Sequence, residues 1–225
     1  MKLTLDLHVH SDASFDGRMS VRQIALLAKA RGIDGVAICD HDVVYTGPTE
    51  VEGVLIIPGA EFSTEYGHLL GLFLTAPIQH TTWKETVQAI HDQGGITVLA
   101  HPYQNKRSGS LEPFRPILDD IDAVETWNSR ANRKYPHAND NAFILALMRN
   151  KLSTGGSDAH VPQEVGRGFL TVDVEERTLA AVKAQILGGY KPEGGRYWGH
   201  GRPSSARYVA SSQRTKLRKA HAGAG

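Results

Sequence analysis

Histidine and carboxylate residues recur in six short segments of this sequence, which read DLHVHSDASFDG, ICDHD, PGAEFS, GHLLGLF, AHPY and GGSDAH. In the first segment His8 and His10 stand two residues apart, a spacing that directs both side chains to one face of a β-strand. Two neighbouring imidazoles can chelate a divalent cation. Isolated pairs of this kind are more often structural, so a metal site requires support from the other segments.

The other segments place further ionisable side chains where a strand is expected to begin or end. Burying many such groups together is very costly unless cations compensate their charge. The joint pattern therefore predicts a site for several metal ions. Its candidate ligands are His8, His10, Asp16, His41, Glu61, His68, His101, Asp158 and His160.

The elements around these segments alternate between strands and helices, which predicts a mostly parallel sheet with helices outside it. Active sites of barrels built this way lie at the carboxyl ends of the strands. Strands are expected at Leu3–Val9, Gly35–Cys39, Val54–Pro58, His68–Leu74, Ile96–Ala100, Asp122–Trp127, Leu152–Gly155 and Phe169–Val174. Helices are expected from Ser20 to Gly32, from Thr82 to Gly94, over Ala138–Asn150 and over Glu176–Leu187.

Two local patterns refine this architecture. Ser20 with Gln23, and Thr82 with Glu85, have the spacing of helix capping boxes. The connection between His41 and Val54 is short and interrupted by Gly47–Pro48, so a crossover with a full helix barely fits there. We expect a loop at this point and a barrel that is irregular or partly open.

Composition sets the remaining bounds. The 225 residues suit one large domain, expected at 1–205 and followed by a basic tail or helix at 206–225, and the formal net charge is +1. The single cysteine, Cys39, excludes an internal disulfide and is expected to be a small buried residue. The first residues are expected to form a strand rather than a signal peptide, and the sequence has no apolar run of membrane-spanning length. A cytoplasmic protein is expected.

The six segments, in this order, resemble the successive motifs of the PHP (polymerase and histidinol phosphatase) family, from about Asp6 to Gly168. The resemblance implies an α/β fold, a distorted, partly irregular (β/α)7 TIM-like barrel, with two or three zinc, manganese or iron ions. Asp16 follows Phe15, so its loop is one residue longer than the usual motif, and the segment between His41 and Glu61 is shorter than usual. Carried over residue by residue, one metal takes His8, His10, Glu61 and Asp158, a second takes Glu61, His68 and His101, and a third takes Asp16, His41 and His160.

The implied activity is hydrolysis of a phosphoester, a small-molecule monoester or a nucleotide or phosphodiester, by a metal-bridging hydroxide. Glu61 bridges two metals, and His41, His160 or Asp16 protonates the leaving group if the third metal is absent. Candidate cations for the phosphate are Arg130 first, then Arg18, Arg107, Arg133 and Lys106, each with a solvent-exposed role as the alternative. Asn128 either orients substrate or supports loop backbone. Glu125, Asp6 and Asp40 are expected to support ligands from behind, and Tyr103 and Trp127 either wall the pocket or pack in the core.

Three alternatives accompany this prediction. The same metals can hydrolyse a carboxylic ester, carbamate or amide, a reaction that has no use for phosphate-binding arginines. A PHP domain can also be a non-catalytic module, but such modules lose ligands and are joined to a polymerase, whereas all nine positions are filled here. Finally, nucleic acid is an expected partner only through the basic segment Arg207–Lys219.

Overall fold

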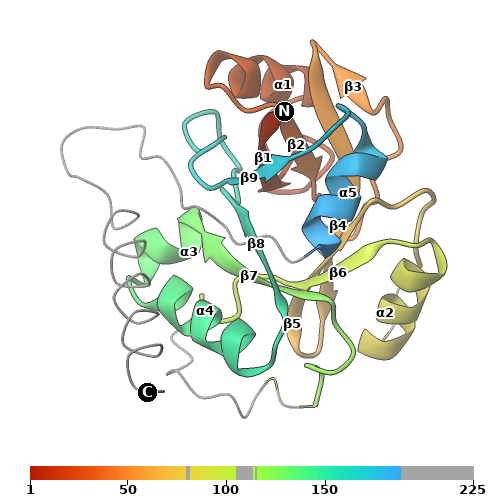
Figure 1. The fold of residues 1–225 in the computed structure, drawn as a ribbon, viewed down its shortest axis with the longest axis vertical. Helices are drawn as coiled ribbons and strands as arrows, with labels where there is room; N and C mark the ends of the chain where they lie inside the picture. The colour runs from red at the N-terminus through yellow and green to blue at the C-terminus, as the bar shows by residue number, and fades with distance from the viewer. Residues whose placement is uncertain (80–81, 105–113, 115, 189–225) are drawn as a thin grey trace.

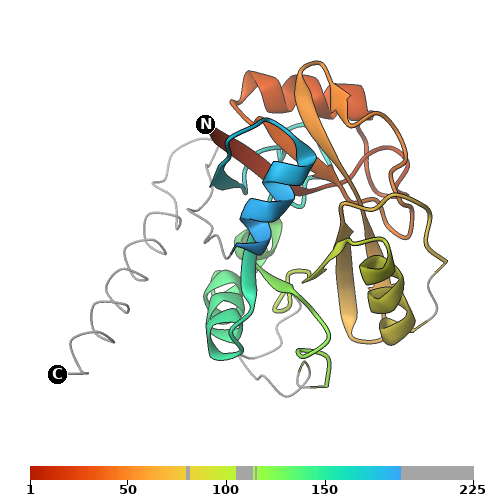
Figure 2. The same ribbon diagram turned by 45° about the vertical axis from the view of Figure 1, so that its right-hand side comes forward.

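The computed structural model describes residues 1–79, 82–104, 114 and 116–188. Within these ranges one mixed sheet curls on itself, and helices lie along its outside (Figure 1, Figure 2). The strands are β1 (Lys2–Val9), β2 (Gly35–Ile38), β3 (Glu50–Val51), β4 (Val54–Thr64), β5 (Gly67–Leu72), β6 (Ile96–Leu99), β7 (Ala123–Asn128), β8 (Leu152–Gly156) and β9 (Leu170–Asp173). The helices are α1 (Val21–Ala30), α2 (Trp83–Asp92), α3 (Ser129–Lys134), α4 (Ala138–Met148) and α5 (Leu179–Leu187).

The strand directions are more mixed than the alternating pattern predicts. The sheet order is β8-β7-β6-β5-β4-β2-β1-β9, with β3 paired to β4. Pairs β1–β2, β2–β4, β6–β7 and β7–β8 are parallel, whereas β4–β5, β5–β6, β1–β9 and β3–β4 are antiparallel. For β4 and β5 the reason is that β4 runs on to Thr64 and turns directly into β5, and so short a connection joins only antiparallel strands.

The connection between β2 and β4 contains no helix, as expected, and its short strand β3 folds back onto β4. At the other end of the sheet, β8 approaches β1 and nearly closes the barrel. There the Asp158 N–H donates to the His8 carbonyl at 2.8 Å, and the His10 N–H donates to the Ala159 carbonyl at 2.9 Å. A Cβ at Gly156 would lie only 2.4 Å from the His8 Cβ, so glycine is required at this approach. The irregular α/β barrel is thus confirmed.

Helix starts follow the capping signals. Ser20 and Gln23 form the complete capping box of α1. Thr82 accepts from the Glu85 N–H at the start of α2, while the Glu85 carboxylate accepts from the Thr82 hydroxyl. The last helix begins after Thr178 rather than at Glu176, because Thr178 accepts from the N–H three residues on. The short helix α3 was not predicted.

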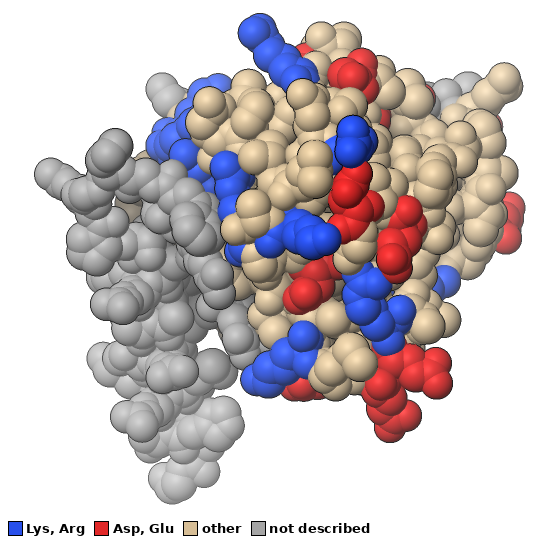
Figure 3. Space-filling view, turned by 90° about the horizontal axis from the view of Figure 1, so that it is seen from above, with Lys and Arg blue, Asp and Glu red and all other residues tan. Residues whose placement is uncertain are grey.

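The apolar core lies on both faces of the strands and leaves the polar site at one edge. Leu5, Leu7 and Cys39 are fully or almost fully buried, which confirms the expected burial of the cysteine. No helix in the described ranges is both long and apolar enough to cross a membrane. In the face that Figure 3 shows, Lys and Arg alternate with Asp and Glu over the middle, and further Lys and Arg lie along the left side of the described surface. The predicted tail at 206–225, with its basic segment, lies outside the described residues.

Candidate metal centre

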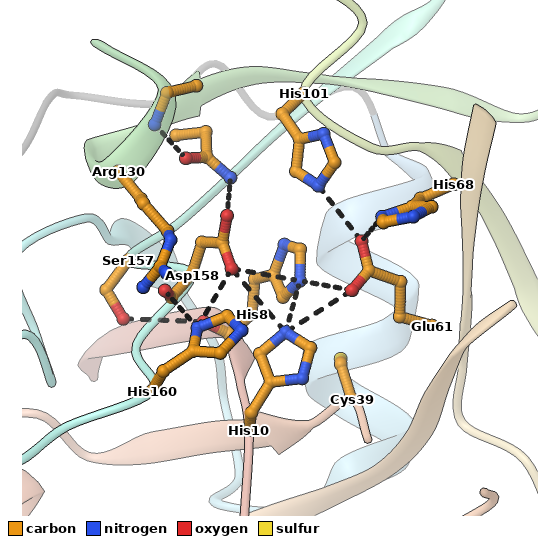
Figure 4. Close-up of polar contacts among 12 residues, drawn as sticks. His8, His10, Cys39, Glu61, His68, His101, Arg130, Ser157, Asp158 and His160 are labelled. Carbon is orange, nitrogen blue, oxygen red and sulfur yellow. Dashed lines mark hydrogen bonds and ion pairs between the residues drawn. The ribbon is translucent and has the colours of Figure 1, made fainter. Parts of the chain in front are cut away.

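All nine predicted ligands gather at one edge of the curved sheet. His10, His41, His101 and Asp158 follow the carboxyl ends of parallel strands, where neighbouring strands bring their last side chains together. His68 reaches the same edge from the start of β5, because that strand runs antiparallel to its neighbours. Glu61 lies within β4, because this strand continues past its expected end at Pro58 as far as Thr64. The barrel therefore brings together residues from the beginning and the end of the domain's sequence (Figure 4).

Four buried side chains form the middle of the cluster. The His8 Nε2 lies 3.1 Å from the His10 Nε2, 3.5 Å from the Glu61 Oε2 and 3.8 Å from the Asp158 Oδ1. The His10 Nε2 lies 3.3 Å from that Glu61 oxygen and 3.5 Å from that Asp158 oxygen. Ligand atoms held about 2.1 Å from a tetrahedral ion lie roughly 3.4 Å apart. The donor set and its spacing therefore fit a divalent metal.

Glu61 connects this group to three more imidazoles. Its Oε1 lies 2.7 Å from the His68 Nδ1 and 2.9 Å from the His101 Nε2. Its Oε2, which faces His8 and His10, also lies 3.3 Å from the His41 Nδ1. The two oxygens of one carboxylate thus face different sets of nitrogens, an arrangement that suits a carboxylate shared between two cations.

A third group forms on the other side of His10. The Asp16 Oδ2 lies 2.8 Å from the His160 Nε2 and 3.4 Å from the His41 Nε2. The His10 ring is stacked on the His160 ring, with centroids 4.1 Å apart, and belongs to the same candidate site. The longer loop at Phe15 therefore still brings Asp16 to the two histidines.

The charges in the cluster depend on one another. Burial opposes ionisation of Glu61 and Asp158, but the neighbouring imidazoles, His8 foremost, outweigh it and hold the pKa of both carboxyl groups below the usual range. Burial also lowers the pKa of His8 and His101, but the carboxylates outweigh it and raise both pKa values. The buried carboxylates thus require positive charge nearby. Protons on imidazole and bound cations are competing ways to supply that charge.

In His8 and His160, the hydrogen bond at Nδ1 determines that Nε2 faces the centre of the cluster. The His8 Nδ1 lies 3.0 Å from the Glu125 Oε1, and the His160 Nδ1 lies 3.0 Å from the Asp158 carbonyl oxygen. A carbonyl or carboxylate oxygen accepts only, so each Nδ1 carries the proton in the neutral ring. Each Nε2 then presents its lone pair to the cluster, as metal-binding histidines do.

Glu125 and Asn128 form a buried network behind the ligands. The other Glu125 oxygen accepts from the His101 N–H and from the Asn128 amide, both at 2.9 Å. The Asn128 amide also donates to the Asp158 Oδ2 at 3.3 Å, and its oxygen accepts from the Ala131 N–H at the start of α3. Asn128 is fully buried, and these bonds favour support of the protein over substrate contact.

Asp6 and Asp40 act on the backbone near the ligands. Asp6 accepts from the N–H groups of Ser157 and Gly166, both at 2.8 Å, and burial raises its pKa to about 6. Asp40 accepts from both the N–H and the hydroxyl of Ser11 at 2.6 Å. Each carboxylate thus ties a ligand-bearing strand or loop to its neighbour through these hydrogen bonds.

Two arginines converge beside His160. Arg130 Nη1 and Arg133 Nη2 each lie 3.1 Å from a different oxygen of Glu164, a residue that the sequence did not single out. The Glu164 Oε2 also accepts from the His160 N–H at 3.1 Å. In Figure 4 the Arg130 side chain points toward Ser157 and His160. Two guanidinium groups share one carboxylate, so a net positive charge remains here, and this charge favours binding of an anion.

The other candidate cations give less support. Arg18 is exposed, and its backbone N–H donates to the His160 carbonyl at 3.1 Å. Arg107 and Lys106 lie outside the described residues.

A small cavity adjoins the centre on the side of His68 and His101. Its volume is about 90 Å³, and Tyr66, Leu99, Pro102 and Phe114 form much of its wall. One water needs about 10–15 Å³, so this is room for several waters or one small ring. Tyr103 and Trp127 are 2% and 3% exposed, which favours core packing for both of them.

The backbone is held in an uncommon conformation at two of the candidate ligands. His101 has a φ of 23° and Asp158 a φ of 56°, both in the left-handed region that residues with side chains rarely adopt. Such strain persists only where the surrounding structure holds it, and it gathers at functional sites.

Comparisons with known proteins give the same picture. Residues 6–103 match the PHP domain, and residues 136–189 match the PHP-associated family. An uncharacterized protein of Methanocaldococcus jannaschii is 33% identical over 176 residues, which are 75% of this chain and 70% of the relative. A protein of Acetivibrio thermocellus described as a probable phosphatase is 26% identical over 204 residues, covering 74% of this chain and 83% of the relative.

Two solved structures share the fold. One is a two-domain protein of Bacteroides vulgatus containing a predicted PHP-like metal-dependent phosphoesterase, with a TM-score of 0.64 and 20% identity, over 83% of this chain and 62% of that chain. The other is the lesion-specific endonuclease EndoQ of Pyrococcus furiosus, with a TM-score of 0.58 and 20% identity, over 94% of this chain and 66% of that chain. From the matched domain and the archaeal relative together, we conclude that this chain belongs to the PHP family of metal-dependent phosphoesterases.

Proposed function

We propose that this protein hydrolyses a phosphate ester, a small-molecule monoester or a nucleotide or phosphodiester, at two or three divalent cations held by the nine clustered residues. The observation that carries the proposal is the convergence of five imidazoles on the two oxygens of buried Glu61. The phosphatase description of one relative and the endonuclease among the structural neighbours support phosphate esters as the substrate class.

The side chains have separate tasks in this reaction. Bound cations would lower the pKa of a water molecule and neutralise charge on the phosphoryl oxygens. Glu61 would be shared between two of them, and Glu125 would hold His8 in the tautomer that exposes Nε2. His41 and His160, which lie beside Asp16 at the outer side, are the proposed donors of a proton to the leaving group when they hold no cation. Burial is outweighed by the Ser14 hydroxyl and the nearby imidazoles, which lower the pKa of the Asp16 carboxyl group, so Asp16 would orient these histidines as a carboxylate. Each of these roles rests on the geometry described above.

Arg130 distinguishes a phosphate ester from a neutral ester or amide as substrate. We expect Arg130→Ala to lower kcat/KM for phosphate esters by about 100-fold, the effect of losing one hydrogen-bond donor to a developing oxyanion. Steady-state kinetics would measure this, with Arg177→Ala as the control. Arg177 pairs with Glu50 at 2.8 Å on the surface, so its loss should leave the kinetics unchanged. Equal kinetics for both variants would remove Arg130 from the site.

The decisive experiment is hydrolysis of a panel of substrates by protein reconstituted with manganese or zinc. It is followed as inorganic phosphate from the monoesters, p-nitrophenol from the diester, shortened chains from the oligonucleotides and free acid from the carboxylic ester. The panel holds histidinol phosphate, nucleoside monophosphates, bis-p-nitrophenyl phosphate, short oligonucleotides and a carboxylic ester. We expect metal-dependent turnover of a phosphate ester, and none in a His8→Ala/Asp158→Ala variant, because both residues belong to the central group. Turnover of the carboxylic ester alone, with metals bound, would replace the proposal by a non-phosphate hydrolase.

A further inference from the structure

Phe15 lies at the rim of the candidate metal centre with most of its surface open to solvent. Its exposed fraction is 88%, the highest among the exposed large hydrophobic side chains of the described residues. Its ring is stacked on the imidazole of His41, with centroids 5.0 Å apart and an angle of 23° between the planes. One face of the phenyl ring therefore lies on a candidate ligand, and the exposure requires that the other face is open.

The loop that carries Phe15 is tied down on both sides of it. The Ser14 hydroxyl donates to the Asp16 Oδ1 at 2.9 Å and accepts from the His41 N–H at 3.2 Å. The Gly17 N–H donates to the Ser14 carbonyl at 3.3 Å, which closes a backbone turn that contains Phe15. These bonds join the turn to His41, so the phenyl ring is held over the site.

A single exposed apolar side chain is ordinary on a protein surface and indicates nothing by itself. Here the exposed ring is held by a bonded turn and lies on one of the candidate ligands. Arg130 reaches the centre from the side of Ser157 and His160, whereas Phe15 lies over His41. A phosphate bound near Arg130 would leave the organic part of the substrate free to extend elsewhere, and the open face of Phe15 is an apolar surface at that rim.

We propose that Phe15 is a stacking platform for a flat aromatic or heteroaromatic ring, such as a nucleobase or an aryl group, in the organic part of the substrate. This proposal rests on the proposed function and specifies its substrate class. Stacking between a ring and an aromatic side chain tolerates many rings, because each presents a π-face. On this proposal Phe15, which precedes Asp16 in the lengthened loop, contributes an apolar ring surface to the site.

Calorimetry with two phosphonates tests the proposal, because a phosphoesterase does not cleave their P–C bond. We expect the wild-type protein to bind phenylphosphonate about tenfold more tightly than methylphosphonate, within the range measured for aromatic stacking. In Phe15→Ala this preference should fall close to one, and Phe15→Trp should restore it. Met148→Ala is the control, since Met148 is 63% exposed on α4 and its loss should leave the preference intact.

An unchanged preference in Phe15→Ala would overturn the proposal, as would its loss in Tyr66→Ala alone, which would assign the ring to the cavity beside His68. Failure of the wild-type protein to bind either phosphonate, with no phosphate monoester or diester hydrolysed, would instead overturn the proposed function. Turnover of a nucleoside monophosphate and of a dinucleotide separates two sources of the ring. A drop in Phe15→Ala on the mononucleotide alone supports a free nucleotide, and a drop on both supports a nucleic-acid end.

Discussion

Replacing Glu61 with glutamine is expected to remove bound metal from the protein and to lower phosphoester hydrolysis by more than about 100-fold. That figure is the upper end of what losing one outer hydrogen bond to a metal ligand costs, and Glu61 is itself the proposed shared ligand. Its two oxygens face five imidazoles, whereas an amide would turn an NH₂ group toward one set of them. The change also removes the negative charge that His8, His101 and His68 stabilise when they hold the pKa of this carboxyl group low.

Metal content by inductively coupled plasma mass spectrometry should fall by at least one equivalent per chain, in step with activity. Circular dichroism should remain that of the wild type, because glutamine keeps the size of the side chain. Glu52→Gln is the matched control, since Glu52 pairs with Arg22 at 2.7 Å on the surface and contacts no candidate ligand. Full metal content in Glu61→Gln would show that this carboxylate is not a shared ligand.

The candidate ligands could be predicted from the sequence because each lies beside a strand whose apolar residues are easily recognised. Strands that run in the same direction place their carboxyl ends at one edge, so His10, His41 and His101, which follow β1, β2 and β6, could be assigned to the same edge once the sheet was inferred. The two-residue spacing of His8 and His10 also fixed a common face. The local pattern was thus enough to predict most of the candidate ligands, and the family resemblance supplied their assignment to individual metals.

The remaining features depend on contacts between distant parts of the chain. Nothing in the pattern around Glu61 shows that β4 continues through it into a hairpin, because the apolar run ends earlier than the strand. Glu164 contacts Arg130 across 34 positions, and no spacing rule connects two such residues. Asn128 likewise gives no sign that it joins Glu125 to Asp158. Positioning residues of this kind become visible only when the fold brings them behind the ligands.

Glu125→Gln is expected to weaken metal binding by about 10- to 100-fold, the usual cost of losing a carboxylate that orients a metal-binding histidine. The Glu125 Oε1 accepts from the His8 Nδ1, and its Oε2 accepts from the His101 N–H and the Asn128 amide. If the glutamine NH₂ group replaced Oε1, it would donate to the His8 Nδ1 and force the His8 proton onto Nε2, where the proton blocks the lone pair that faces the centre. If the NH₂ group replaced Oε2, it would face two other donors, the His101 N–H and the Asn128 amide. Neither orientation of the amide preserves the network.

Titration of the metal-depleted protein with zinc or manganese, followed by calorimetry, would measure this affinity. Asp122→Asn is the matched control, because Asp122 also bonds a histidine, His91, at 3.0 Å and a backbone N–H, that of Thr97, at 2.9 Å. That pair lies outside the candidate metal centre, so its loss should lower the melting temperature and leave metal affinity unchanged. Equal loss of affinity in both variants would mean that the effect comes from general destabilisation. Loss confined to Glu125→Gln would show that this carboxylate supports the metal-binding histidines specifically.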